Sequence, residues 1–112
     1  IAASIPVEDA EWIPALYPGF VLQEGMTSEY VRILQQYLTY IHGTVPSIPE
    51  VRDTGYFGPV TRSAVTAFQR YAGLTLNGVV GAVTWDGIAG LYSDLRFGYE
   101  KRPYQAPGYT IR

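Results

Sequence analysis

The side chains that could catalyse a reaction are few in this chain of 112 residues. His42 is the single histidine and cysteine is absent, so the sequence predicts no thiol nucleophile and no zinc centre, which commonly takes several His, Cys or carboxylate ligands. A Ser-His-Asp triad would have to use His42, which stands beside Gly43 where a helix is expected to end. We expect His42 to cap that helix, where a cation is favourable.

A glycosidase would need two carboxylates on either side of a sugar bond. The acidic residues are scattered, and most fall in predicted turns or first helical turns: Glu24, Glu29, Glu50, Asp53 and Asp86. Carboxylates at such places suit the positive end of the helix dipole. The sequence therefore predicts a domain without catalytic activity, metal site or cofactor.

The composition narrows the partners that the chain can have. Its net charge is −2, with a single lysine and no basic run, whereas phosphate-driven binding of nucleic acid needs a basic surface. A hydrophobic fraction of 47% without a long apolar run fits a soluble globular chain that does not insert into a membrane. Ten Tyr, two Trp and seven Arg favour recognition by hydrogen bonding and stacking over point charge.

One domain with a linking segment on each side is expected from the length and from the distribution of proline and glycine. Residues 1–17 contain prolines without sustained periodicity, which is typical of a lead-in or linker, and the domain is expected over 18–92. Residues 93–112 mix glycine, proline and aromatic residues, as a tail or linker does. Since the chain begins at Ile1, we expect a processed protein or a piece of a longer one.

A short phrase occurs twice and determines the expected fold. Residues 54–61 and 77–84 both read polar-Gly-x-x-Gly-x-Val-Thr. Two glycines three positions apart, with apolar residues between them, suit a tight turn with positive φ, and the x-Val-Thr that follows can begin a helix. The chain is therefore expected to repeat a unit of loop and helix.

Apolar residues at helical spacing predict three helices, over about 28–41, 59–72 and 82–91. Thr27 or Ser28 is the expected N-cap of the first helix. Pro59 suits the first position of the second helix, and Gly73 is expected to end it. The predicted fold class is all-α, a three-helix bundle with repeated Gly-x-x-Gly turns.

Taken in order, the motifs of this chain resemble the bacterial peptidoglycan-binding domain of the three-helix type. The resemblance covers about residues 18–91 with family-like spacing, and it is the co-linear set of motifs that makes it specific. Its members are Leu22–Gly25, Val31–Leu38, Gly55–Thr61, Ala64–Gln69, Gly73–Leu74 and Asn77–Trp85. The loop Val45–Pro49 further resembles versions found in Gram-positive, spore-forming bacteria.

The resemblance implies a non-catalytic module that holds a cell-wall enzyme or another envelope protein on peptidoglycan, outside the cell. Its expected partners are peptidoglycan and a linked catalytic domain. The family usually has Asp-Gly where this chain has Thr54-Gly55 and Asn77-Gly78. Asn and Thr can also hydrogen-bond a turn locally, so we expect the fold to be kept and any ligand contact through those carboxylates to be lost.

A site for peptidoglycan should combine aromatic faces with Arg and amide groups, because the polymer presents sugar rings, hydroxyls, amides and free carboxylates. Candidate residues are expected at the first repeated turn and the neighbouring helix starts: Tyr56, Phe57, Thr61, Arg62, Arg32, Gln35 and Trp85. Tyr56 and Arg62 are the preferred contacts.

Several of these candidates have a structural alternative. Phe57 and Trp85 are residue types that more often belong to a core than to a ligand platform. Gln35 can tie loop backbones together, as can Gln69, and Arg62 can cover a helix surface with its stem.

A different class of function stays open, in which the module packs against a catalytic domain or another protein and regulates it. The aromatic segment 92–112 could dock on such a partner. A segment packed on its own domain would weaken that hypothesis.

Overall fold

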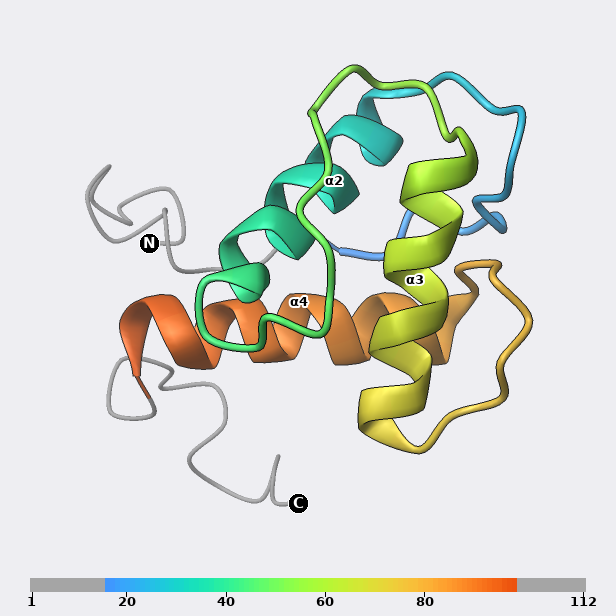
Figure 1. The fold of residues 1–112 in the computed structure, drawn as a ribbon. Helices are drawn as coiled ribbons and strands as arrows, with labels where there is room; N and C mark the ends of the chain where they lie inside the picture. The colour runs from blue at the N-terminus through green and yellow to red at the C-terminus, as the bar shows by residue number, and fades with distance from the viewer. Residues whose placement is uncertain (1–15, 99–112) are drawn as a thin grey trace, which may run out of the picture.

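The computed structural model describes residues 16–98, and in this part of the chain it contains three helices (Figure 1). They are α2 (Glu29–His42), α3 (Pro59–Ala72) and α4 (Ala82–Phe97). α4 runs across the other two, and α2 packs more extensively against α4 than either packs against α3. The predicted all-α three-helix bundle is confirmed. The predicted lead-in up to residue 15 and the tail beyond residue 98 lie outside the described residues.

Local sequence signals explain where α2 begins and ends. Ser28 is the N-cap, and its Oγ accepts a hydrogen bond of 3.0 Å from the backbone N–H of Tyr30. His42 is the last helical residue, and its Nδ1 lies 2.8 Å from the carbonyl oxygen of Ile48. Because a carbonyl oxygen only accepts, this nitrogen carries the proton, and the imidazole ties the end of α2 to the following loop.

The limits of α3 agree with the prediction. Pro59 occupies the first turn, where its missing N–H costs no helical hydrogen bond. Gly73 follows the helix with φ of 76°, and its N–H bonds back to the carbonyl groups of Arg70 and Gln69. A left-handed residue at this place ends the helix and turns the chain toward the second repeated phrase.

The third helix is longer than predicted, because α4 continues to Phe97 where the sequence pattern predicts an end near Leu91. Ser93 is fully buried, and the Tyr92 ring stacks on the Tyr37 ring of α2 with a centroid separation of 4.3 Å. Tertiary packing therefore extends the helix into a segment predicted to be tail.

One of the glycines inside α4 allows close packing against α3. A Cβ on Gly87 would lie 3.2 Å from the Phe68 ring of α3, so the glycine lets the two helices approach each other at this point. A Cβ on Gly90 would meet nothing within 4 Å, so close packing does not require a glycine at this position. The low helix propensity of both residues is offset by the packing of α4 on the core.

The core lies where the three helices and their turns meet, and its largest fully buried apolar side chains come from every part of the domain: Leu22, Leu34, Leu38, Ile41, Ile48, Phe57, Phe68, Trp85 and Ile88. Two buried glutamines accompany them, Gln35 and Gln69, each only 1% exposed. A buried amide is stable only when its donors and acceptors are bonded, which makes these two residues important for the turns.

Each helix is preceded by the same kind of turn. The turns begin with glycines of positive φ, namely Gly25 (101°), Gly55 (86°) and Gly78 (73°), and each reaches the N-cap three residues later. The turn before α2 is not recognised as a third copy of the phrase in the sequence, because Ser28 stands where the other two copies have a second glycine.

Short backbone pairings connect these turns. Thr27 and Tyr56 form an antiparallel bridge between the first two turns, and Leu22 pairs with Val80 of the third with N–O distances of 3.0 and 2.8 Å. The turns are therefore joined to one another and not only to the helices. Among the described helices none combines the length and the apolar character needed to cross a membrane.

Candidate ligand-binding groove

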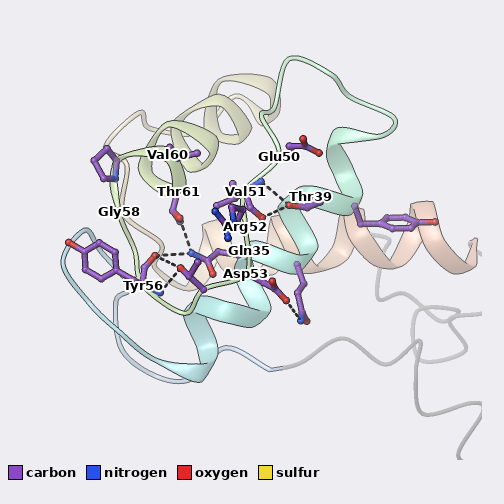
Figure 2. A pocket seen from close by; sticks show the side chains of 14 residues that line it. Gln35, Thr39, Glu50, Val51, Arg52, Asp53, Tyr56, Gly58, Val60 and Thr61 are labelled. Atoms are coloured by element: carbon purple, nitrogen blue, oxygen red, sulfur yellow. Dashed lines mark hydrogen bonds between the residues drawn. The ribbon is translucent and has the colours of Figure 1, made fainter.

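A groove of about 910 Å³ lies between α2 and the segment from residue 50 to the first turn of α3, and we call it the first groove. One wall is formed by Gln35, Gln36, Thr39 and Tyr40 of α2. Residues 50–54, 56 and 58–61 form the other wall. Figure 2 shows Gln35 between the two walls, bonded to the backbone and side chains of the opposite segment.

Gln35 fixes the floor of the first groove. Its Nε2 donates to the carbonyl of Tyr56 at 2.8 Å and to Oγ1 of Thr61 at 3.0 Å. Its Oε1 accepts from the backbone N–H of Gly55 at 2.9 Å. One buried side chain thereby satisfies the turn and the start of α3 together, and it holds the backbone that carries Tyr56.

The Tyr56 ring stands on this fixed backbone and is 50% exposed. The backbone N–H of Tyr56 donates a hydrogen bond of 3.1 Å to Thr54 Oγ1, which closes the turn locally. A Cβ on Gly58 would lie 3.1 Å from the ring, so the glycine lets the ring lie against the beginning of α3. The result is an aromatic face whose position is set by the backbone.

The far wall is tied to α2 through a single hydroxyl. Thr39 Oγ1 donates to the carbonyl of Val51 at 2.6 Å and accepts from the N–H of the same residue at 2.8 Å. Glu50 and Arg52, on either side of Val51, are exposed and line the groove. The groove therefore presents the Glu50 carboxylate and the Arg52 guanidinium, and the segment that carries both is anchored to α2 at Val51.

Asp53 adds a second acid whose charge is stabilised. Gln36 Nε2 donates to its carboxylate at 3.0 Å, and Arg32 Nη1 lies 3.8 Å away. The Gln36 hydrogen bond, a backbone hydrogen bond and the charge of Arg32 keep the pKa of Asp53 below its usual value. Arg32 also forms an ion pair with Glu29. The hydrogen bond that Arg32 donates to Glu29 is the main cause that lowers the pKa of this carboxyl group.

Four of the predicted site residues are found at this groove. Gln35, Tyr56 and Thr61 line it, and Arg32 lies at its edge through its ion pair with Asp53. Gln35 and Thr61 are buried at 1% and 2% exposure, so they shape the groove more than they offer surface to a ligand. Tyr56 alone among the predicted residues presents a large exposed face inside it.

The structure places the other three predicted residues elsewhere. Phe57 is fully buried and Trp85 is 1% exposed, so both rings belong to the core and neither faces a ligand in this conformation. Arg62 lies against the second repeated turn, since a Cβ on Gly78 would be 2.9 Å from its Cζ, and it approaches Glu24 at 4.0 Å. The Arg62 side chain therefore covers the second repeated turn.

The groove residues that the sequence does not predict include two large, exposed apolar or aromatic side chains. Tyr40 is 40% exposed on α2, and Val60 is 57% exposed at the beginning of α3. Both fall outside the apolar stripe of their helix, and a large apolar or aromatic residue on the outer face of a predicted helix is the signal that could have found them.

The chemistry available in the first groove is non-covalent recognition. It offers aromatic faces, hydroxyls, two carboxylates and one guanidinium. Among the described residues, no group of three or more His, Asp or Glu side chains is arranged to hold a metal ion.

Comparison with known proteins shows the family to which the chain belongs. The family described as "Putative peptidoglycan binding domain" matches residues 27–88. The zinc D-Ala-D-Ala carboxypeptidase of Streptomyces albus G is 37% identical over 73 residues, which are 65% of this chain and 28% of that enzyme. The chain thus spans less than a third of that relative's length.

A solved structure, the N-terminal domain of SleB, is similar to this chain with a TM-score of 0.59 and 28% identity, over 70% of this chain and 99% of that domain. The family match covers more than half of the chain and includes both walls of the first groove. The chain therefore belongs to the peptidoglycan-binding domain family and contains a non-catalytic peptidoglycan-binding module.

Proposed function

We propose that the first groove is the peptidoglycan site of this module, and that the module holds a wall-processing or envelope protein at the cell wall, outside the cell. The observation that carries the proposal is Tyr56, a half-exposed ring on a backbone fixed by Gln35 inside the matched region. A rigid aromatic face costs little side-chain entropy on binding, which suits weak, repeated contacts with a polymer.

The lining of the first groove fits the groups that peptidoglycan presents. Tyr56 and Tyr40 offer faces for sugar rings and methyl groups. Arg52 suits a free carboxylate of a stem peptide, and Glu50 can accept from hydroxyl or amide groups. Such a site gives modest affinity for one unit, and tandem modules or a linked enzyme would add avidity.

A linked catalytic domain is part of the proposal because the carboxypeptidase relative is much longer than this chain. The module would raise the local concentration of such an enzyme at the wall without taking part in the reaction. In this proposal, the catalytic activity, the substrate and the partners of the longer protein are properties of the linked domain and not of the module.

The alternative of a docking module is weakened at the start of the aromatic segment. Tyr92 stacks on Tyr37, and Phe97 packs edge-on against Tyr92 with centroids 6.4 Å apart. These two rings are used within the domain. The rest of the segment lies outside the described residues.

Co-sedimentation with insoluble peptidoglycan sacculi in moderate salt tests the proposal. Wild-type protein should pellet, and Tyr56→Ala should weaken binding about three- to tenfold through loss of the aromatic contact. Arg62→Ala is the matched control, because Arg62 lies outside the groove. Loss of binding by the Arg62 variant with full binding by the Tyr56 variant would move the site away from the first groove. If wild type does not pellet, the docking alternative becomes the better account.

A further inference from the structure

A second, smaller groove of about 370 Å³ lies at the second repeated turn, and we call it the second groove. It is lined by residues between 74 and 84, and each lining residue stands 23 positions after a lining residue of the first groove. Tyr56 corresponds to Val79 and Val60 to Val83 in this way. The chain therefore contains the turn-side wall of the first groove twice.

The same hydrogen bonds hold both walls. Gln69 Nε2 donates to the carbonyl of Val79 at 3.0 Å and to Oγ1 of Thr84 at 3.2 Å, and its Oε1 accepts from the N–H of Gly78 at 3.0 Å. Asn77 Oδ1 accepts from the N–H of Val79 at 3.1 Å. The side chains that line the second groove are therefore placed by a scaffold as rigid as that of the first.

Exposed apolar residues occur at equivalent positions of the two grooves. Val60 is 57% exposed and Val83 is 69% exposed, and both are the second residue of their helix. A single exposed valine is ordinary on a protein surface. Two that line grooves of the same construction point to a shared use.

The grooves differ in charge. The first is lined by Glu50, Arg52 and Asp53, whereas no titratable side chain lines the second. Val79, Val83 and the hydroxyl-bearing Thr75 are among the residues that line it. This lining suits a neutral group that carries a methyl and an amide, and it offers no partner for a carboxylate or an amine.

We propose that the second groove is a second contact for the same peptidoglycan strand and takes neutral acetamido groups of the glycan; this inference rests on the proposed function of the first groove. The two grooves lie near opposite ends of α3, whose 14 residues span about 20 Å at 1.5 Å per residue. Only an extended ligand can reach both, and peptidoglycan is such a polymer. Binding at both grooves makes affinity depend on strand length.

The test compares a single soluble disaccharide-peptide unit with glycan strands of several units, by calorimetry or fluorescence titration. Val83→Asp should weaken binding of the long strands about three- to tenfold and leave binding of the single unit to the first groove unchanged. Val60→Asp should weaken both. Ser63→Asp adds the same charge on α3 outside both grooves and controls for repulsion at a distance. Val60 and Val83 lie in the first turn of their helices, where an acid is compatible with folding, and thermal melts of all three variants check that they fold.

The outcomes separate the two proposals. If Val83→Asp binds long strands as Ser63→Asp does while Val60→Asp is impaired, the second groove carries no ligand and the proposed function stands. If none of the three changes affects long strands, both proposals fail. If Val83→Asp also weakens the single unit as strongly as the long strands, the grooves are not separate contacts and the inference is overturned.

Discussion

Gln35 on α2 and Gln69 on α3 close the turns that follow their helices with the same set of hydrogen bonds. Each amide nitrogen donates to a turn carbonyl and to the threonine in the first turn of the next helix. Each amide oxygen accepts from the turn glycine. Both side chains are 1% exposed, so the amide end of each of these bonds is shielded from water.

Replacing either glutamine with alanine should therefore be costly. Gln69→Ala leaves the buried N–H of Gly78 and the partly buried carbonyl of Val79 without their partner, and each buried group left unpaired costs about 1–3 kcal/mol. We expect a loss of about 2–4 kcal/mol in the free energy of unfolding, measured by urea denaturation. Gln35→Ala should behave alike. The exposed Gln23→Ala should change stability by less than about 0.5 kcal/mol; equal losses at the exposed and buried sites would contradict this role.

Gly78 should tolerate alanine poorly for two reasons. Its φ is 73°, where a side chain is strained, and a Cβ would meet Cζ and Cγ of Arg62 at 2.9 and 3.0 Å, so that the Arg62 side chain would have to move. We expect Gly78→Ala to destabilise by about 1–3 kcal/mol in thermal or urea unfolding. Gly90→Ala is the matched comparison in α4, where the added Cβ would meet nothing within 4 Å and the higher helix propensity of alanine should raise the free energy of unfolding by about 0.5–1 kcal/mol. Similar effects of the two changes would rule out the conformational argument.

Tyr92 should stabilise the domain and the wall of the first groove together. It stacks on Tyr37 at 4.3 Å and meets Tyr40 edge-on at 5.4 Å, and Tyr40 lines the groove. Tyr92→Ala should cost about 1–3 kcal/mol and weaken sacculus binding at least twofold at a temperature where the variant is folded. The exposed Tyr71→Ala should do neither. Unchanged stability of the Tyr92 variant would show that the stacking of this ring on Tyr37 does not stabilise the domain.

Acid should weaken the domain through the carboxylates around Arg32. The pKa values of Glu29 and Asp53 are lowered from 4.5 and 3.8 in the folded state, so folding favours their charged forms. Their stabilisation is present at neutral pH and is lost as the pH falls below these ordinary values and through the lowered ones. The double variant Glu29→Gln, Asp53→Asn should show a smaller decrease of melting temperature between pH 6 and about pH 3 than wild type. A steeper decrease in the variant would contradict the sign of both shifts.

Much of the fold could be predicted from the sequence because its signals are local. Helix starts follow from Ser28 and Pro59, and turns with positive φ follow from paired glycines. The extension of α4 could not be predicted, because it depends on the stacking of Tyr92 on a helix that lies far away in sequence. The turn at Gly25 could not be predicted for a different reason, because Ser28 stands where the repeated phrase has its second glycine.

The candidate site was predicted less well than the fold. The sequence predicts the site at the first repeated turn, and the structure has a groove there that Tyr56 lines. Adjacent residues in an irregular turn face different directions, so Phe57 enters the core while Tyr56 does not. Arg62 shows a second limit, because a long side chain can cross to a neighbouring turn, and only the three-dimensional arrangement reveals that it covers Gly78.

The pairing of Leu22 with Val80 has a mechanical consequence if the module holds a protein at the wall, as we propose. Leu22 is fully buried and joined to the third turn by two backbone hydrogen bonds. A force that pulls on the chain N-terminal to Leu22 therefore acts on the turn before α4 as well as on the start of α2. The load is shared between elements that lie far apart in sequence, so pulling on this end must break a tertiary connection before α2 can unravel.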